Sequence, residues 1–432
     1  MLVNRKQIIT VLFCLGLPMS ASRAETLEEA WDTALAADQG LASVRSQIQS
    51  AQATVSAAKA QRLPTVELDA AFTQLDDTPG LDLSALGLTL PDAVDHDNFL
   101  AASAMVNLPL YTGGQISNGI NAANAALQAN QNQEAAAVQN LKLAVADAFV
   151  LVLRATHAVD VANANVESLQ GHATDVENLF KQGLVPHNDL LAVQVSLANA
   201  QQKALQTSNG LDIAKAAYNR QLGRALDADV ALDEVMPLVD PLARVDELDK
   251  LTSTALENRS ELSALLNQSS ALSYQGQAAR ASTLPTVGLN ATYRYLENDA
   301  LDDENLASVA LGVSWALYDG GLAKHRATAL EQQAQAARDM NKDLDSGIRL
   351  QVRSAWLSIN EAKRRMIVAE KAVAQAEQNL KVAKDRYQNG IGTNTEVLDA
   401  EALRSVSQLN NNDARYDAAL ARLKLARSLG VL

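Results

Sequence analysis

The sequence predicts an α+β membrane fold in which two similar halves each combine very long helices with a β-hairpin. The first observation is a long-range repeat: Leu-Pro-Thr-Val at residues 63–66 returns at 284–287, and Tyr-Thr-Gly-Gly at 111–114 returns as Tyr-Asp-Gly-Gly at 318–321. The second is a pair of proline-free stretches with helical apolar spacing. A repeat of roughly 200 residues is too long for a solenoid unit, so it indicates a duplicated half.

Residues 1–24 have the composition of a secretory signal. Arg5 and Lys6 precede an apolar stretch over residues 8–17 and a small-x-small cleavage site at 22–24. That stretch is too short to anchor the chain across a bilayer. Cys14 is the only cysteine and would leave with the signal, so we expect a mature chain without disulfides.

The chain is strongly acidic. Its formal net charge of −14 at pH 7 would become −17 once the signal removed Arg5, Lys6 and Arg23, because no acid leaves with them. Nucleic-acid binding requires basic patches, so this balance argues against a nucleic-acid partner. No other stretch reaches the ~18 apolar residues of a spanning helix. Any membrane insertion of the mature chain is therefore expected to use β-strands in a closed barrel.

Two very long helices are predicted, the first over residues 115–181 and the second 207 residues later. Their apolar or small residues recur at steps of three and four, which is typical of a coiled coil. The seams contain Val138, Leu141, Val145, Ala148 and Val152 in the first, and Val352, Ala355, Ile359, Ala362 and Met366 in the second. A helix of about 67 residues extends roughly 100 Å.

Each long helix is expected to end at a glycine turn, at Gly183 in the first half and Gly390 in the second. Glycine suits the left-handed position just past a helix end. Asn188 and Thr395 are expected to cap the helices that return from these turns. Four further helices are expected, two returning from the turns and two opening the halves: residues 189–222, 396–429, 26–61 and 248–282.

Between the opening helix and the long helix of each half lie two strand-like segments, in hairpins over about residues 64–110 and 285–317. Apolar residues alternate with small or polar ones, as in membrane β-barrel strands, although a half-buried soluble sheet has the same pattern. The signal and the long helices favour the barrel. Four strands cannot close a barrel, so the chain would have to oligomerise. Acidic residues fill both hairpin loops, which we expect to be solvated and extracellular.

The order of these segments closely resembles the TolC-like outer-membrane efflux family, over residues 25–432. Each half has a helix, a hairpin ending in Pro-Leu-Tyr-Thr-Gly-Gly or Ala-Leu-Tyr-Asp-Gly-Gly, a long helix, a glycine turn and a return helix. The resemblance implies a homotrimer whose twelve strands form one barrel in outer-membrane lipid, continuous with a periplasmic coiled-coil tunnel. It also implies an exit duct for a tripartite efflux pump or a type I secretion system, energised by an inner-membrane pump acting with a periplasmic adaptor (membrane fusion protein).

We divide the sequence accordingly into four segments. They are the signal (1–24), the first repeat (25–224), a linker or equatorial segment (225–247) and the second repeat (248–432).

The resemblance also assigns a gate at the periplasmic helix ends. Glu-Val-Leu-Asp-Ala at residues 396–400 matches the family's Asp-Val-Leu-Asp-Ala, so Glu396 and Asp399 would face the constricted tunnel end. Asp189 is the corresponding acid of the first half. Tyr387 matches an aromatic that helps to tie neighbouring helices shut. The arginine expected five residues after this tyrosine is Gly392 here, so one partner of the family's constraining salt bridge is absent.

The glycine turns would meet the hairpins of the adaptor, at Gly183 and Leu184 in the first half and at Gly390 and Ile391 in the second. A simpler interpretation of the acids also exists, because Asp189 and Glu396 begin helices, where the helix dipole favours negative charge. Asp399 lies one turn further along, and three copies of it would form a ring that attracts cations.

No catalytic, cofactor or metal site is predicted, and an enzyme is not expected. The glycine pairs at 113–114 and 320–321 are not followed by the Gly-Lys-Ser/Thr of a phosphate loop. The five histidines show no metal-ligand spacing. The alternative to a duct is a secreted or surface coiled-coil protein with a structural or adhesive role and no pore.

Overall fold

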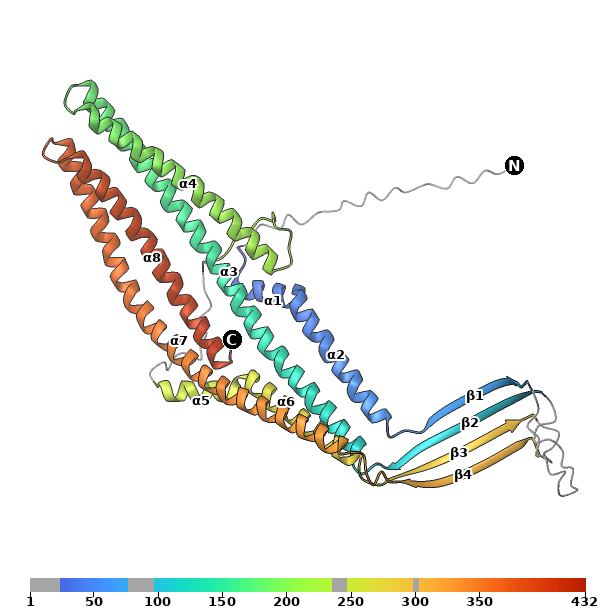
Figure 1. The fold of residues 1–432 in the computed structure, drawn as a ribbon. Helices are drawn as coiled ribbons and strands as arrows, with labels where there is room; N and C mark the ends of the chain where they lie inside the picture. The colour runs from blue at the N-terminus through green and yellow to red at the C-terminus, as the bar shows by residue number, and fades with distance from the viewer. Residues whose placement is uncertain (1–23, 77–96, 235–246, 298–302) are drawn as a thin grey trace, which may run out of the picture. The chain divides into compact units, whose positions relative to one another are not determined.

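The computed structural model describes residues 24–76, 97–234, 247–297 and 303–432, and Figure 1 shows the order of its elements. The predicted signal, most of both acidic hairpin loops and part of the linker lie outside the described residues. The helices and strands are α1 (Leu27–Ala37), α2 (Gln39–Ala60), β1 (Thr65–Gln74), β2 (Asn98–Tyr111), α3 (Gln115–Lys181), α4 (His187–Gln221), α5 (Leu248–Asn258), α6 (Ser260–Ala281), β3 (Thr286–Leu296), β4 (Asn305–Ser314), α7 (Leu322–Gln388) and α8 (Asn394–Leu429).

The two long helices are confirmed. α3 and α7 contain 67 residues each, and both ends of α7 lie 207 residues after those of α3. Seam residues such as Val145, Val152, Val352 and Ile359 are buried. Because apolar residues spaced by three and four share one face of a helix, the seam supplies the packing face of each long helix.

One helix among the described residues, α3, is long and apolar enough to cross a membrane by length and composition alone, with a window of mean hydropathy 1.6. The expectation that no stretch outside the signal is apolar enough for a spanning helix was therefore wrong. The cause is the dense seam of this helix, in which Val145, Phe149 and Val150 are buried inside the protein. Phe149 packs edge-on against Tyr218, with ring centroids 6.0 Å apart. Of the apolar window, 44% is buried inside the single chain.

The opening helix of each half is broken, where one continuous helix was expected. Asp38 separates α1 from α2 in an extended conformation (φ −67°, ψ 120°), and its side chain accepts the amide of Leu41 at 2.7 Å. Arg259 separates α5 from α6 with φ −72° and ψ 102°. Gly40 lies two residues after the first break, but no proline or glycine lies beside the second, and the apolar spacing runs through both.

The glycine that follows each return helix packs against the corresponding break. A Cβ on Gly223 would lie 3.0 Å from the Cβ of Ala37, and a Cβ on Gly430 would lie 2.8 Å from the carbonyl oxygen of Asn258. Any larger residue would push the return helix away from the break. Gly223 and Gly430, which lie 207 residues apart, therefore mark a close approach of two helices.

Charged residues surround the second break. Glu261 pairs with Arg259 at 3.0 Å and with Arg427 at 2.6 Å, and Arg259 also donates to Gln351 at 3.0 Å. We call Arg259, Glu261 and Arg427 the corner cluster. Burial would raise the pKa of Glu261, but the hydrogen bonds from the two arginines outweigh it and lower the pKa to about 2.

The return helices begin two residues earlier than expected, and the predicted caps were wrong. α4 begins after Pro186, which stands at the cap position in an extended conformation and has no side-chain group that could accept a hydrogen bond. At the start of α8 the Thr393 hydroxyl accepts the amide of Glu396 at 3.3 Å. Asn188 and Thr395 therefore lie inside the first turns.

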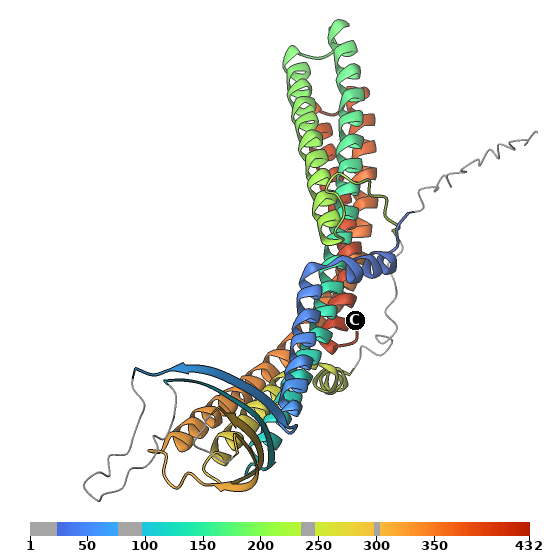
Figure 2. The same ribbon diagram turned by 90° about the vertical axis from the view of Figure 1, so that its right-hand side faces the viewer.

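The four strands form one antiparallel sheet in the order β1-β2-β3-β4, which confirms the predicted hairpins. The hairpins join through β2 and β3, where Ala104 faces Tyr293 and Leu108 faces Leu289. Figure 2 shows the strands bending together as one curved sheet. Large apolar side chains on the outer strands β1 and β4 are exposed in the single chain: Val66, Leu68, Phe72, Leu306, Val309, Leu311 and Val313.

The chain divides into two compact units, each with segments from both halves of the sequence. Unit 1 comprises Met1–Ala37, Ala144–Leu238 and Arg364–Leu420, and unit 2 comprises Asp38–Leu143, Val239–Lys363 and Ala421–Leu432. Unit 1 contains the ends of α3 and α7 and most of both return helices. Unit 2 contains the sheet, the corner cluster and an apolar core that includes Leu251, Ile348, Val352 and Leu425.

Candidate gate site

The candidate gate lies in unit 1, where the chain turns from α3 into α4 and from α7 into α8 (Figure 1). Gly183 and Gly390 adopt φ values of +74° and +72°. The amide of the next residue donates to a carbonyl five positions back, at 2.9 Å for Leu184 and 3.0 Å for Ile391, which closes each helix end. Leu184 and Ile391 are exposed, so each turn presents an apolar side chain to solvent.

An apolar core lies next to the turns and draws on all four helices. Its buried members are Ala173, Val176, Leu190, Val193, Leu380, Ala383, Tyr387, Val397 and Ala400. They follow the spacing of three and four along each helix, so the same pattern that builds the long helices packs the two hairpins at this end.

The structure brings two predicted gate residues together. Tyr387 is buried, and its hydroxyl donates to the Oδ2 atom of Asp189 at 3.4 Å. Burial raises the pKa of Tyr387 to about 12, and the charge of Asp189 adds to the effect. The hydroxyl therefore keeps its proton at neutral pH and can donate. This bond joins the end of α7 to the start of α4.

The other two predicted gate acids lie outside this pair. Glu396 and Asp399 are both exposed on the first turns of α8. Glu396 Oε2 lies 3.7 Å from Arg386 Nε, and the Arg386 guanidinium also donates to the carbonyl of Ile391 at 3.1 Å. Arg386, one residue before Tyr387, supplies a cation here and was not among the predicted gate residues.

Gly392 stands in a crowded position. A Cβ at this residue would lie 3.0 Å from the Cβ of Arg386 and 3.1 Å from the backbone nitrogen of Tyr387. Any side chain here, including the arginine that the family resemblance implies, would need a shift of a few tenths of an ångström. The turn of this chain is therefore packed around a glycine at 392.

A buried polar pair that sequence reasoning missed crosses between the two hairpins. Nε2 of His172 on α3 lies 2.8 Å from Oδ1 of Asn394, the first residue of α8, and both side chains are 4% exposed. The Asn394 amide nitrogen donates to the carbonyl of Asp189 at 3.1 Å. The His172 ring meets the Tyr387 ring edge-on at 5.4 Å. Asn394, positioned by His172, thus holds the backbone of Asp189, and the carboxylate of Asp189 accepts the hydrogen bond from Tyr387.

Two turns along α8 from Asn394, Glu401 is fully buried in a charged cluster. Its carboxylate pairs with Lys384 at 2.8 Å and Arg404 at 3.1 Å, and accepts a hydrogen bond from the Ser168 hydroxyl. Removing a charge from water is costly unless partners compensate it, and two cations do so here. The cluster joins α3, α7 and α8.

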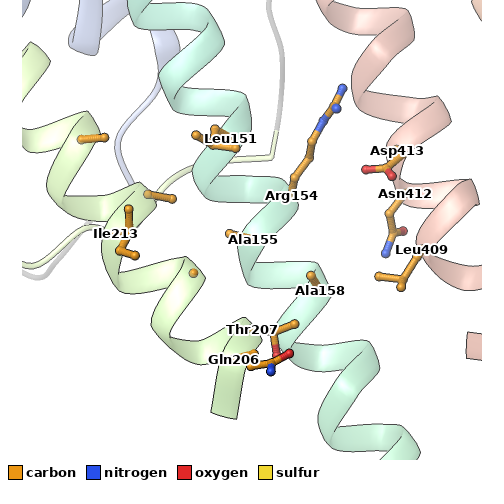
Figure 3. A pocket seen from close by; sticks show the side chains of 13 residues that line it. Leu151, Arg154, Ala155, Ala158, Gln206, Thr207, Ile213, Leu409, Asn412 and Asp413 are labelled. Atoms are coloured by element: carbon orange, nitrogen blue, oxygen red, sulfur yellow. The ribbon is translucent and has the colours of Figure 1, made fainter. Parts of the chain in front are cut away.

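A surface groove of about 480 Å³ lies further along the same helices (Figure 3). Leu151, Ala155 and Ala158 of α3 form its floor, and Ile213 of α4 lines one side. Asn412 and Asp413 of α8 line the other side. The lining is mostly apolar and open, which suits a protruding apolar side chain better than a small polar ligand.

Among the described residues, no group of histidine, cysteine, aspartate and glutamate side chains is placed to hold a metal ion.

Comparison with known proteins gives a consistent family. The family model described as "Outer membrane efflux protein" matches residues 30–224 and 251–431. The outer membrane protein TolC of Vibrio cholerae is 25% identical over 433 residues, covering 97% of this chain and 93% of that protein. The alkaline protease secretion protein AprF of Pseudomonas aeruginosa is 24% identical over 309 residues, covering 68% of this chain and 62% of that protein.

Solved structures show the same fold. The outer membrane protein VceC of Vibrio cholerae superposes with a TM-score of 0.81 at 20% identity, covering 94% of this chain and 96% of that one.

Proposed function

The chain belongs to the outer membrane efflux protein family, and we propose that three copies of it form one exit duct that is gated at the ends of the helical hairpins. Proteins of this family are outer-membrane efflux and secretion channels that extend into the periplasm, and this chain is one of them. The proposal adds the number of copies, the gate and the partners.

The four-stranded sheet carries the proposal of a trimer. Its outer strands β1 and β4 each pair with one neighbour only in the described chain, and they expose apolar side chains such as Leu68, Phe72 and Val309. Unpaired edges are unstable in lipid, where no water satisfies the backbone, and closure removes them. Four strands are too few to close a barrel, whereas three copies provide twelve.

The gate is proposed at the residues that unit 1 brings to the hairpin ends. The hydrogen bond from Tyr387 to Asp189 ties the two hairpins of one copy together. Exposed Glu396 and Asp399 supply negative charge on α8, and in a ring of three copies they would attract cations to the duct entrance.

Partners are proposed at the turns. Because the chain belongs to the outer membrane efflux protein family and is similar to a protease secretion protein, we place the energy source in an inner-membrane pump, joined through a periplasmic adaptor. Leu184 and Ile391 support this, because each is an exposed apolar residue at the tip of a hairpin and fits a groove between partner helices. A coiled-coil structural or adhesive role without a pore is the alternative, and no observation favours it.

The test is trimer formation and conductance. The exported protein should appear in the outer-membrane fraction as a trimer that heat dissociates on denaturing gels, and the purified trimer should conduct ions in planar bilayers. A soluble product without conductance would overturn the duct.

The acids are tested in the same bilayers. Replacing both Glu396 and Asp399 by alanine should weaken the block of the channel by divalent cations, because the entrance loses negative charge. Unchanged block would reject the assignment of these two residues and leave the duct itself intact.

A further inference from the structure

His172 and Asn394 are in contact, and their counterparts in the other repeat are again one histidine and one asparagine, in exchanged positions. Adding 207 to His172 gives Asn379 on α7, and subtracting 207 from Asn394 gives His187 at the start of α4. We propose that Asn379 of one copy pairs with His187 of the next copy, so that the buried contact inside each chain is repeated between chains. The inference rests on the proposed trimer and defines the register of its interface.

The geometry of the inner contact indicates which surfaces would meet. Inside one chain, His172 on α3 of the first hairpin contacts Asn394 on α8 of the second. If each partner is replaced by its repeat counterpart one hairpin further along the chain, α3 becomes α7, and α8 becomes α4 of the hairpin that follows. In a closed ring that following hairpin belongs to another copy. The same step that relates the two hairpins of one chain would then relate neighbouring copies.

Burial supports the exchange. His172 and Asn394 are buried, whereas Asn379 and His187 are exposed in the single chain. The pattern holds at two further positions of the first hairpin. Phe180 is 36% exposed and its repeat counterpart Tyr387 is 6% exposed, while Ile213 is 62% exposed and its counterpart Leu420 is 8% exposed.

These differences identify a face of the first hairpin that lacks a cover in the single chain. Ile213 also lines the groove of Figure 3. Tyr387, the counterpart of Phe180, is covered by the first hairpin of the same chain, where it shares a core with Ala173 and Val176 and contacts the ring of His172. A second copy of this chain fits the open face, because its second hairpin (α7 and α8) has the same repeat as the hairpin that covers the other face.

The chemistry of the pair tolerates the exchange. The Asn394 Oδ1 atom can only accept, so His172 donates from Nε2. A histidine at 187 can donate to Asn379 Oδ1 in the same way, because the bond requires one imidazole N–H and one amide oxygen. His187 already packs on Phe180 with ring centroids 5.1 Å apart, as His172 packs on Tyr387 at 5.4 Å.

The first test is site-directed cross-linking in outer membranes. With His187→Cys and Asn379→Cys in the same chain, a short bis-maleimide should produce covalent dimers and trimers, because each copy carries both halves of a head-to-tail interface. Either substitution alone should give monomer only. The matched control is His172→Cys with Asn394→Cys, whose link should stay inside one chain. Cys14 is the only native cysteine, so the unsubstituted protein controls for it.

The second test exchanges the pair and measures the temperature at which the trimer dissociates. His187→Asn alone and Asn379→His alone should each lower that temperature, since they leave two amides or two imidazoles facing each other. The double exchange should restore it, because it recreates the arrangement of His172 and Asn394.

The outcomes separate the two proposals. Stable conducting trimers without covalent oligomers, and with unchanged dissociation temperatures in both single variants, would overturn the pairing and leave the duct intact. Failure of the unsubstituted protein to form trimers or to conduct would overturn the proposed function itself.

Discussion

The corner cluster of unit 2 and the tip contact of unit 1 join helices in different ways. Glu261 is held by two arginines at 3.0 Å and 2.6 Å, which are strong, charge-assisted bonds. At the tip, Tyr387 reaches Asp189 through one bond of 3.4 Å, at the long end of the hydrogen-bond range. The difference indicates that the bond between Tyr387 and Asp189 costs less to break than the ion pairs of the corner cluster.

The largest effect is expected at the corner. Glu261→Gln removes the charge that compensates Arg259, whose side chain is buried. Loss of one partner from a buried ion pair leaves the other uncompensated, and we expect unfolding to become easier by about 2 kcal/mol because Glu261 is partly solvated. Asp345→Asn is the matched control, since Asp345 pairs with Arg349 on an exposed helix face and should cost about 0.5 kcal/mol or less. Thermal unfolding followed by circular dichroism measures both, and equal effects would contradict the contrast.

The same acid predicts how the corner responds to pH. Its pKa is lowered to about 2 from an ordinary value of 4.5. A lowered pKa means that the stabilisation is fully present above the ordinary value and is lost as the pH falls through the folded value. Unfolding temperatures should therefore fall between pH 4.5 and pH 2 by more in the native protein than in Glu261→Gln.

At the tip, deletion of one hydroxyl should favour opening. Tyr387→Phe removes the bond to Asp189 and keeps the ring in the core. A hydrogen bond contributes about 1 kcal/mol net, so we expect about a fivefold rise in the open population. Single-channel recordings in planar bilayers measure it. Tyr416→Phe is the control, because Tyr416 is equally buried in unit 1 but stacks on His157. If both variants behave alike, the tip bond has no special role.

The contrast also explains what the sequence could predict. Long helices, strands and turn glycines follow from periodicity, which is local. The breaks at Asp38 and Arg259 were not predicted because the apolar period runs through both. Gly40 lies two residues after Asp38, but a single glycine inside a helical pattern does not by itself end a helix, and no proline or glycine lies beside Arg259. The family resemblance placed Tyr387 and Asp189 at the gate but did not pair them, and the local pattern could not, since the two residues lie 198 positions apart.

Two buried polar residues of the tip left a signal that could have been used. Asn394, Val397 and Glu401 follow steps of three and four on α8, so two polar side chains occupy core positions of a coiled coil. Such residues need buried partners, because an unpaired polar group in the core is costly. The sequence could therefore indicate that partners exist, but it could not identify Lys384 and His172 among the many polar residues of the other helices.

A smaller effect is expected from the protonation of His172. Burial is the main cause that lowers its pKa, the bond to Asn394 opposes this, Lys384 lowers it further, and Asp175 and Glu401 raise it. A histidine with a lowered pKa stabilises the closed tip above its ordinary value of 6.5 and loses that contribution as the pH falls. Channel opening should therefore increase on acidification from pH 7.5 to pH 5.5. His172→Gln keeps a donor to Asn394 but cannot be protonated, so its opening should depend less on pH, and an identical profile would contradict the assignment.

The smallest effect is expected at Gly392, where this chain departs from the family pattern. The Cβ of Gly392→Arg would press on Arg386 and on the backbone of Tyr387, while its charge would repeat that of Arg386, which already faces Glu396. Crowding at the turn favours the open state, whereas an added positive charge near Glu396 favours the closed state. The open population should therefore change by less than in Tyr387→Phe. Gly392→Ala separates the two, because it adds the Cβ without the charge. If Gly392→Arg closes the channel strongly and Gly392→Ala does not, the arginine side chain adds a contact that holds the tip closed, and the glycine weakens the closed state of this chain.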